Sequence, residues 1–182
     1  MKYCPACGKE GLQYPGNRYW NCNSCGFTLY NNVAAATGVI FFCLNDDKSR
    51  TILVEERAMD PGKGKLGLPG GFVDPDERAE DCAVRECQEE IGITVSEDKL
   101  QYLTSLANTY EYKSITYKTC DVYFLCEVTA FEMFRIKKAA VMQQSEVRRI
   151  TTIDIRKDTD VKQLPFAFVS ANNALKQWQT TF

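Results

Sequence analysis

The densest group of chemically capable side chains lies in residues 71–93, with the sequence GFVDPDERAEDCAVRECQEEIGI. Its second half predicts a helix, because apolar residues recur there at the intervals that form one helical face. Gly92 stands where a helix typically ends. Glu86, Glu89 and Glu90 are spaced by three and four positions, so their carboxylates project from one side of this helix.

Carboxylates held this close together favour a bound cation. Like charges at helical spacing repel one another by roughly a few tenths of a kcal/mol per pair, even on an exposed surface. Hard oxygen ligands of this kind select Mg²⁺, Mn²⁺ or Ca²⁺. The segment therefore predicts a divalent-metal site on one side of the helix. The alternative is a solvated acidic helix.

The same segment resembles the Nudix box without a gap. Gly71 is followed after five residues by Glu77, and after seven more by Arg85-Glu86-Cys87-Gln88-Glu89-Glu90-Ile91-Gly92-Ile93. The one soft match is Cys87, a small apolar residue where the family usually has a larger one. The resemblance implies a hydrolase of nucleoside diphosphates linked to another group, X, that works through Mg²⁺ or Mn²⁺.

The resemblance also assigns roles within the box. It implies that Glu86, Glu89 and Glu90 bind Mg²⁺ and act in catalysis, and that the carbonyl group at Gly70 is a further ligand. Residues that support the box structurally are Gly71, Glu77 and Arg85. Arg85 is expected to reach back to Glu77 and hold the loop on the helix, which the family pattern begins just after Glu77. Local rules instead favour a helix start at Asp74-Pro75.

A further acid lies far from the box in sequence. Glu146 precedes a stretch that resembles the Nudix segment in which a glutamate stands before a strand. There the glutamate often supplies an extra metal ligand or the general base, so we assign Glu146 to one of these roles. Its alternative is a solvated loop acid. Glu89, Glu90 and Glu146 all remain candidates for the general base, because spacing alone does not choose among them.

Four of the nine cysteines form two CxxC pairs, Cys4/Cys7 and Cys22/Cys25, each followed by glycine. Two such turns brought together make a tetrahedral thiolate cage, which is the preferred site of structural Zn²⁺. Disulfides and a redox CxxC are the alternatives, and iron could occupy the same cage. Four thiolates leave no position open for water, so the zinc is expected to be structural. A ribbon this small should fold only with its metal.

The other five cysteines lie in apolar patterns and predict buried hydrophobic side chains rather than nucleophiles. The chain contains no histidine, which excludes catalysis by Ser-His or Cys-His pairs. The formal net charge of -2 gives no overall attraction for nucleic acid. The sequence shows no apolar run long enough to cross a membrane and no signal-peptide core at its N-terminus, so a cytoplasmic location is expected.

The elements that must position these residues follow from local patterns. Residues 33–44, 51–57, 101–112 and 114–128 predict strands, and the last two predict an antiparallel pair. Residues 130–144 fit either a strand or a short helix. Residues 169–178 predict an amphipathic helix that packs through Val169, Asn172, Ala174, Leu175 and Trp178.

Three tyrosines on the predicted pair of strands, Tyr110, Tyr112 and Tyr117, could stack on a nucleobase. The alternative is that they stabilise the sheet through cross-strand contacts.

The expected fold is α/β: a small Cys4 zinc ribbon over residues 1–31, followed over residues 32–182 by the Nudix α/β/α sandwich with a mixed sheet. This order is similar to the NADH pyrophosphatase arrangement, although residues 103–109 lack the Ser-Gln-Pro-Trp-Pro-Phe-Pro stretch of that subfamily. NAD(H), ADP-ribose, nucleotide sugars, dinucleoside polyphosphates and damaged nucleoside triphosphates are candidate substrates. The alternative is a nucleotide-sensing or regulatory binding module with little catalysis. The expected partner is a small nucleotide, without nucleic acid or membrane, and a homodimer is possible.

Overall fold

The computed structural model describes residues 1–139 and 146–182. Within it the chain forms two compact units, Met1–Val33 and Ala34–Phe182. The division falls two residues after the boundary expected from the cysteine spacing. Each unit has its own sheet, so each is described by itself.

The first unit is a three-stranded antiparallel sheet. Its elements are β1 (Leu12–Gln13), η1 (Pro15–Asn17), β2 (Tyr19–Cys22) and β3 (Thr28–Tyr30). The ring of Trp20 stacks on that of Tyr14, with centroids 4.5 Å apart. Of the residues in this unit whose burial the structure describes, only Cys4 and Cys22 are fully buried. The centre of the unit is therefore made of sulfur rather than of a hydrocarbon core.

The second unit is built on a mixed six-stranded sheet in the order β6-β5-β4-β8-β7, with β9 paired to the other edge of β5. The pair β4 and β8 is parallel, and the other pairs are antiparallel. The strands are β4 (Ala34–Leu44), β5 (Arg50–Arg57), β6 (Leu66–Gly67), β7 (Gln101–Tyr112), β8 (Ile115–Glu127) and β9 (Val147–Ile155).

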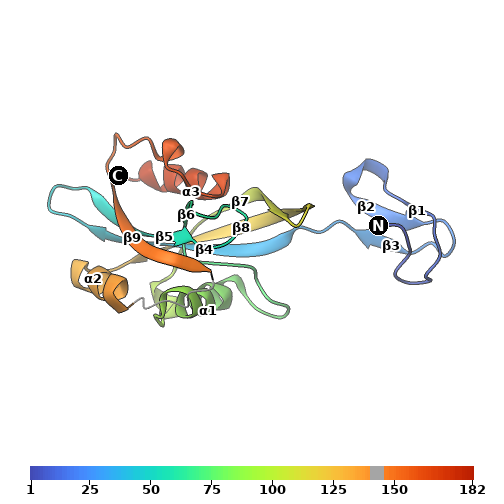
Figure 1. Cartoon of the computed structure of the whole chain (residues 1–182), viewed down its shortest axis with the longest axis horizontal. Coiled ribbons are helices and arrows are strands. Elements are labelled where there is room, and N and C mark those ends of the chain that lie inside the picture. Colours follow the sequence, from blue (N-terminus) through green and yellow to red (C-terminus); the bar gives the residue numbers. More distant parts are fainter. Residues whose placement is uncertain (140–145) are drawn as a thin grey trace. The chain divides into compact units, whose positions relative to one another are not determined.

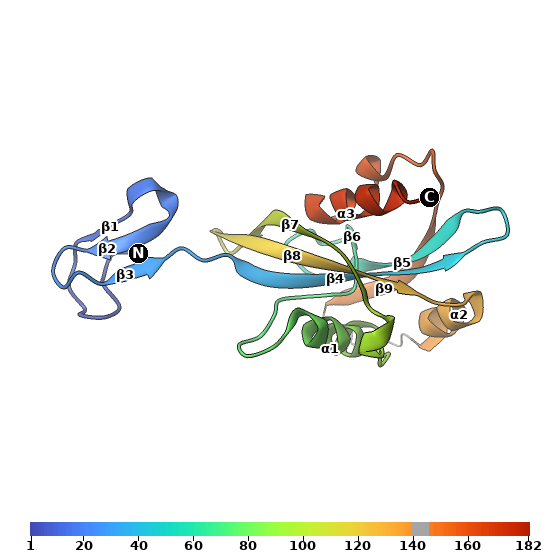
Figure 2. The ribbon, with the colours of Figure 1, turned by 180° about the vertical axis from the view of Figure 1, so that it is seen from behind.

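Helices cover both faces of this sheet (Figures 1 and 2). They are α1 (Ala79–Ile91) and α2 (Ala130–Ala139) on one face and α3 (Val169–Gln179) on the other, with short 3-10 turns η2 (Glu97–Lys99) and η3 (Val161–Gln163). Alternation along β4 explains the two cores. Val39 and Phe41 point to α1 and α2, whereas Ile40 and Phe42 point to α3. The expected α/β/α sandwich with a mixed sheet is confirmed.

The predicted elements agree closely with the structure, with two exceptions. Residues 130–139, left open between strand and helix, form α2, and the remainder of that segment to residue 144 extends beyond the described residues. In α3 the expected packing is confirmed for the four buried residues Asn172, Ala174, Leu175 and Trp178. It is wrong for Val169, which is 69% exposed because it lies on the outer face of α3 with Asn173 and Lys176, whereas the adjacent Ser170 is buried.

Helix α1 begins at Ala79, directly after the loop that holds Glu77, and not at Asp74-Pro75. Asp76 has a left-handed φ of 66°, so the turn that begins at Asp74 does not continue into the helix. At the later start the backbone N–H of Arg78 donates to Asp81, and the Arg78 side chain forms ion pairs with Asp81 and Glu97. The helix ends before Gly92, whose φ of 69° is left-handed and favours glycine. These two ends fix which way the helical carboxylates face.

Candidate active site

A cleft of about 350 Å³ opens in the second unit, where α1, the loop before it and the β7–β8 hairpin meet. One wall carries box residues, and the other carries residues from β7, β8 and the start of α3. The first wall includes the side chains of Arg85, Glu86, Glu90 and Glu146, and the second includes those of Asn108, Tyr110, Asp121 and Phe168. Glu89 is not among the lining residues.

The loop of residues 68–73 lies against β4 and brings the box to the cleft. The backbone N–H groups of Thr37 and Val39 donate to the carbonyl oxygens of Gly71 and Pro69, both at 2.8 Å. A Cβ added at Gly70 would lie 2.2 Å from the carbonyl oxygen of Thr37, and φ there is 147°. A Cβ at Gly71 would lie 2.3 Å from Oε1 of Glu86. Both glycines are therefore needed for this close approach.

Glu90 is the most enclosed carboxylate of the box, with 8% of the residue exposed. Its Oε2 accepts a hydrogen bond of 2.8 Å from the backbone N–H of Gly70. Burial, followed by the nearby charge of Glu55, raises the pKa of Glu90 well above its usual range. An anion at this position is stable only with a positive partner.

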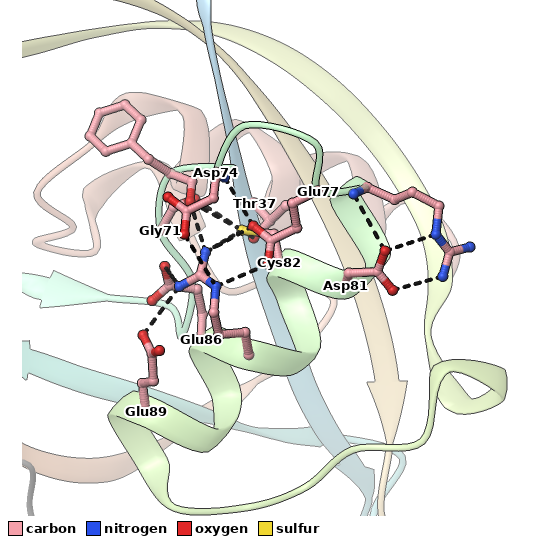
Figure 3. Close-up of polar contacts among 11 residues, drawn as sticks. Thr37, Gly71, Asp74, Glu77, Asp81, Cys82, Glu86 and Glu89 are labelled. Atoms are coloured by element: carbon pink, nitrogen blue, oxygen red, sulfur yellow. Dashed lines mark hydrogen bonds and ion pairs between the residues drawn. The ribbon is translucent and has the colours of Figure 1, made fainter.

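Arg85 bonds three acids of the box, Glu77, Glu86 and Glu89, which are labelled in Figure 3. Its Nε and Nη2 donate to the two carboxylate oxygens of Glu77 at 2.9 and 3.0 Å, which confirms the expected contact between loop and helix. Its Nη1 donates to Glu86 at 2.8 Å and to Glu89 at 3.1 Å. The guanidinium lowers the pKa of Glu77 by hydrogen bonding. Burial raises the pKa of Glu86, against the effect of Arg85.

Glu55 is an acid next to this site that the sequence reading did not assign. It lies on β5 opposite Gly67 and is 2% exposed, and its Oε2 has no hydrogen-bond partner among the described residues. A Cβ at Gly67 would lie 2.8 Å from its Oε1, so that glycine makes room for the carboxyl group. The sequence signal that could have identified Glu55 is an acidic residue at an inward-facing position of an apolar strand.

The carboxyl group of Glu55 should make the stability of the metal-free protein depend on pH. Burial raises its pKa from 4.5 to about 7. Because the folded state then binds the proton more tightly than the unfolded state, stability is lost as the pH rises from about 4.5 to 7. Replacing Glu55 with Gln should remove this loss and raise the free energy of unfolding at pH 8 by about 3 kcal/mol.

Urea unfolding with a chelator present, at pH 5 and pH 8, measures this effect. The matched control is Glu56→Gln, on the same strand but paired with Arg148 and Arg149 at the surface. Equal responses of the two variants to pH would contradict the assignment.

Glu146 lines the cleft and lies beside the end of β5. Its backbone carbonyl accepts a hydrogen bond of 2.7 Å from the N–H of Ala58, which fixes the residue just before β9. Its charge contributes to the raised pKa values of Glu55, Glu86 and Glu90. Four acids from three separate segments therefore interact electrostatically at this wall.

The donor groups of this wall suit a hard divalent cation. Carboxylate oxygens and a glycine carbonyl are the ligands that Mg²⁺ and Mn²⁺ prefer, and the unpartnered oxygen of Glu55 adds negative charge in a buried place. In the described part of the chain, however, the box carboxylates do not form a set whose oxygens all lie within 4.8 Å of one another. Instead, Nη1 of Arg85 bonds Glu86 and Glu89, and the Gly70 N–H bonds Glu90.

Cys4, Cys7, Cys22 and Cys25 do form such a set in the first unit, with all four sulfur atoms within 4.8 Å of one another. The Sγ atoms of Cys4 and Cys25, and those of Cys7 and Cys22, are 3.8 Å apart. Hydrogen bonding from the backbone of Cys25 lowers the pKa of Cys22 to about 6. This geometry is compatible with a tetrahedral zinc site that has no open position.

The opposite wall of the cleft is aromatic and polar. The ring of Tyr110 stacks on that of Phe168, with centroids 5.5 Å apart, and meets the ring of Phe72 edge-on at 5.2 Å. Tyr110 therefore lies at the cleft, as the stacking hypothesis requires. Tyr112 and Tyr117 are 43% and 41% exposed and do not belong to the lining. Tyr117 is the direct cross-strand partner of Tyr110.

The fold and this box define a Nudix-type domain, and comparison with known proteins agrees. Residues 34–156 match the family described as NUDIX domain, so the chain belongs to the Nudix family. The structure resembles a NUDIX hydrolase from Nitrosomonas europaea, with a TM-score of 0.59, 21% identity and coverage of 99% of this chain and 91% of that one. It also resembles the NUDIX domain of Shewanella oneidensis NrtR, complexed with ADP ribose, with a TM-score of 0.60, 20% identity and coverage of 82% and 90%.

Curated relatives include the NAD-capped RNA hydrolase NudC of Pseudomonas fluorescens strain Pf-5. It is 30% identical over 104 residues, which cover 57% of this chain and 35% of that protein. The NudC of Pseudomonas syringae pv. tomato is 28% identical over the same length. The matched region thus spans about a third of these relatives. Among the described residues, the helices are too short or too polar to span a membrane.

Proposed function

We propose that the chain hydrolyses the diphosphate linkage of a nucleoside diphosphate joined to a second group, X, with Mg²⁺ or Mn²⁺. The observation that supports this most is the meeting of Glu86, Glu90 and Glu146 with an aromatic wall in one cleft. Acids on one side can hold a cation against phosphates, while Tyr110 and its neighbours offer a surface for the organic part of the substrate.

Different residues of the site have different roles in the proposed reaction. Glu86, Glu89, Glu90 and the carbonyl group of Gly70 would hold the metal. When bound, the metal neutralises the phosphate oxygens and lowers the pKa of water. Arg85 holds the helical acids and the Glu77 loop in register. The glycines at 70 and 71 let the loop lie close to β4 and to the carboxyl group of Glu86.

A proton must leave the attacking water, and one of the carboxylates accepts it. Glu89, Glu90 and Glu146 are the candidates. Glu146 and Glu90 line the cleft, whereas Glu89 is 49% exposed at its side chain and lies outside the lining. This placement favours Glu90 or Glu146 as the base and leaves Glu89 to the metal.

The identity of X is the finer part of the proposal. NAD(H), ADP-ribose and nucleotide sugars all contain the required linkage. The similarity to NudC proteins supports a substrate with the NAD-type diphosphate, and the ADP-ribose complex of the NrtR domain shows that a related fold accepts that nucleotide. The second candidate function is a nucleotide-sensing module with little catalysis, which the NrtR structure bound to a 27mer DNA favours.

Incubation of the purified chain with Mg²⁺ and a panel of NAD, NADH, ADP-ribose and nucleotide sugars tests the proposal. We expect each accepted substrate to yield two monophosphates, with turnover that disappears when EDTA is added. A matched reaction with Ca²⁺ in place of Mg²⁺ shows whether the ion takes part in the chemistry or only in binding. Tight nucleotide binding without any product would support the sensing module instead.

A further inference from the structure

The second wall of the cleft contains a buried acid that the proposed chemistry does not use. Asp121 lies on β8, between Ala36 of β4 and Leu106 of β7, and is 7% exposed where it borders the cleft. It takes part in none of the ion pairs among residues 1–139 and 146–182. A buried carboxyl group without a cation is costly unless its hydrogen bonds compensate for it.

Hydroxyl groups orient this carboxyl group from behind. Thr119 donates to Oδ1 at 2.6 Å and Ser170 donates to Oδ2 at 2.7 Å. The hydroxyl group of Tyr123 donates in turn to Ser170 at 2.9 Å. All these hydrogens point toward Asp121, so both of its oxygens act as acceptors. Any further partner in the cleft must therefore be a donor.

Neighbouring groups show what kind of donor fits. Asn108 lies opposite Thr119 on the paired strand, and its side-chain amide has no partner among the described residues. Two residues further along β7, Tyr110 turns its ring to the same side and stacks on Phe168. An acceptor, an amide and two aromatic rings on one wall form the surroundings that suit a flat heterocycle with a polar edge.

We propose that Asp121 is a specificity residue that accepts a hydrogen bond from the amino group of the nucleobase, while Asn108 bonds a ring nitrogen or oxygen beside it. The base lies along the aromatic pair Tyr110 and Phe168. The inference rests on the proposed function for the identity of the substrate as a nucleotide. It assigns amino-substituted bases as the substrate class, against bases that lack the amino group.

Calorimetric binding without added metal separates this inference from the chemistry. The probes are ADP and GDP, compared with purine riboside diphosphate and IDP, which lack the corresponding amino groups. We expect the wild-type protein to bind one amino nucleotide about 10- to 100-fold more tightly than its analogue. Asp121→Asn should weaken the binding of that nucleotide by a similar factor and leave the affinity for the analogue nearly unchanged.

The matched control is Asp154→Asn, which changes a carboxylate that also accepts from a threonine hydroxyl group, but on β9 and outside the cleft. Equal wild-type affinities for amino nucleotides and analogues would overturn the inference even if Asp121→Asn did not fold. An equal loss for both members of a pair would overturn it too, since that result points to ribose hydroxyl groups or to general damage. If neither ADP nor GDP binds to the wild-type protein, the inference is also overturned.

The outcomes separate the two proposals. A collapsed preference in Asp121→Asn, without hydrolysis by the wild-type protein in Mg²⁺, supports the base-recognition site and contradicts the proposed reaction. Hydrolysis by the wild-type protein, with a nucleotide preference that Asp121→Asn leaves unchanged, supports the proposed reaction and contradicts the base-recognition site.

Discussion

Replacing Glu90 with Gln should lower kcat by about a hundredfold or more while the fold survives. The amide oxygen of Gln can still accept the hydrogen bond from the Gly70 N–H, so the contact between loop and helix is kept. What disappears is the negative charge, on which both the proposed metal binding and proton transfer depend. Steady-state hydrolysis of the best substrate in Mg²⁺ measures the effect.

The same substitution, Glu90→Gln, should leave the stability of the metal-free fold unchanged or raise it. Burial and the neighbouring acids raise the pKa of Glu90, which means that its charge is unfavourable in the metal-free fold. The free energy of unfolding of Glu90→Gln at pH 8 with a chelator should therefore equal or exceed that of the wild-type protein. Glu80→Gln, on the same helix but outside the cleft, is the control. Near-normal turnover of Glu90→Gln would contradict the metal assignment.

Replacing Cys22 with Ser should abolish zinc binding and unfold the first unit while the second unit stays folded. Among the residues of the first unit whose burial is described, only Cys4 and Cys22 are fully buried, so these residues form no hydrocarbon core. Structural zinc in peptides of this size contributes about 10 kcal/mol or more of folding free energy. The second unit contains two separate hydrophobic clusters and does not need that contribution.

The two tryptophans allow the units to be followed separately. Trp20 reports on the first unit and Trp178 on the second. In a Trp178→Phe background, Cys22→Ser should shift the emission of Trp20 to the wavelength of water-exposed tryptophan and reduce bound zinc from one ion per chain to none. Cys120→Ser, which alters a half-buried cysteine of β8, should keep both signals. Unchanged Trp20 emission in zinc-free Cys22→Ser would show that the cage is not what folds the unit.

Most of the fold could be predicted because its signals are local. The β7–β8 hairpin and β5 are rich in apolar, β-branched and aromatic residues, which predict strands from the local sequence alone. The start of α1 required more than local rules, since Asp74-Pro75 is a good cap by itself. Segment 130–139 was undecided because its apolar residues suit either period, and packing of Met133 and Ile136 under the sheet selects the helix.

The site was less predictable, because a cleft joins residues that are distant in sequence. The box glutamates could be found from their own spacing. Asp121 reaches the cleft through the parallel pairing of β8 with β4, and Phe168 through the position of α3. No spacing encodes either contact. Tyr110 could not be separated from Tyr112 by pattern, since alternate residues of a strand share one face. Distance along the hairpin decides between them.

The β7–β8 hairpin supplies Asn108, Tyr110 and Asp121 to one cleft wall, and the start of α3 adds Phe168. Its strands are consecutive in the chain and are joined by Lys113-Ser114, both in left-handed conformations. The opposite wall is encoded separately, by the box and by Glu146. Substitutions at Asn108 and Asp121, which line the cleft from this hairpin, change the wall that the box and Glu146 do not form. Phe124 and Cys126 pack in the cluster that includes α1, so substitutions there would disturb the box helix. An evolving lineage, or an engineer who changes only the cleft-lining positions, could change the nucleotide that is recognised and leave the bond-breaking half intact.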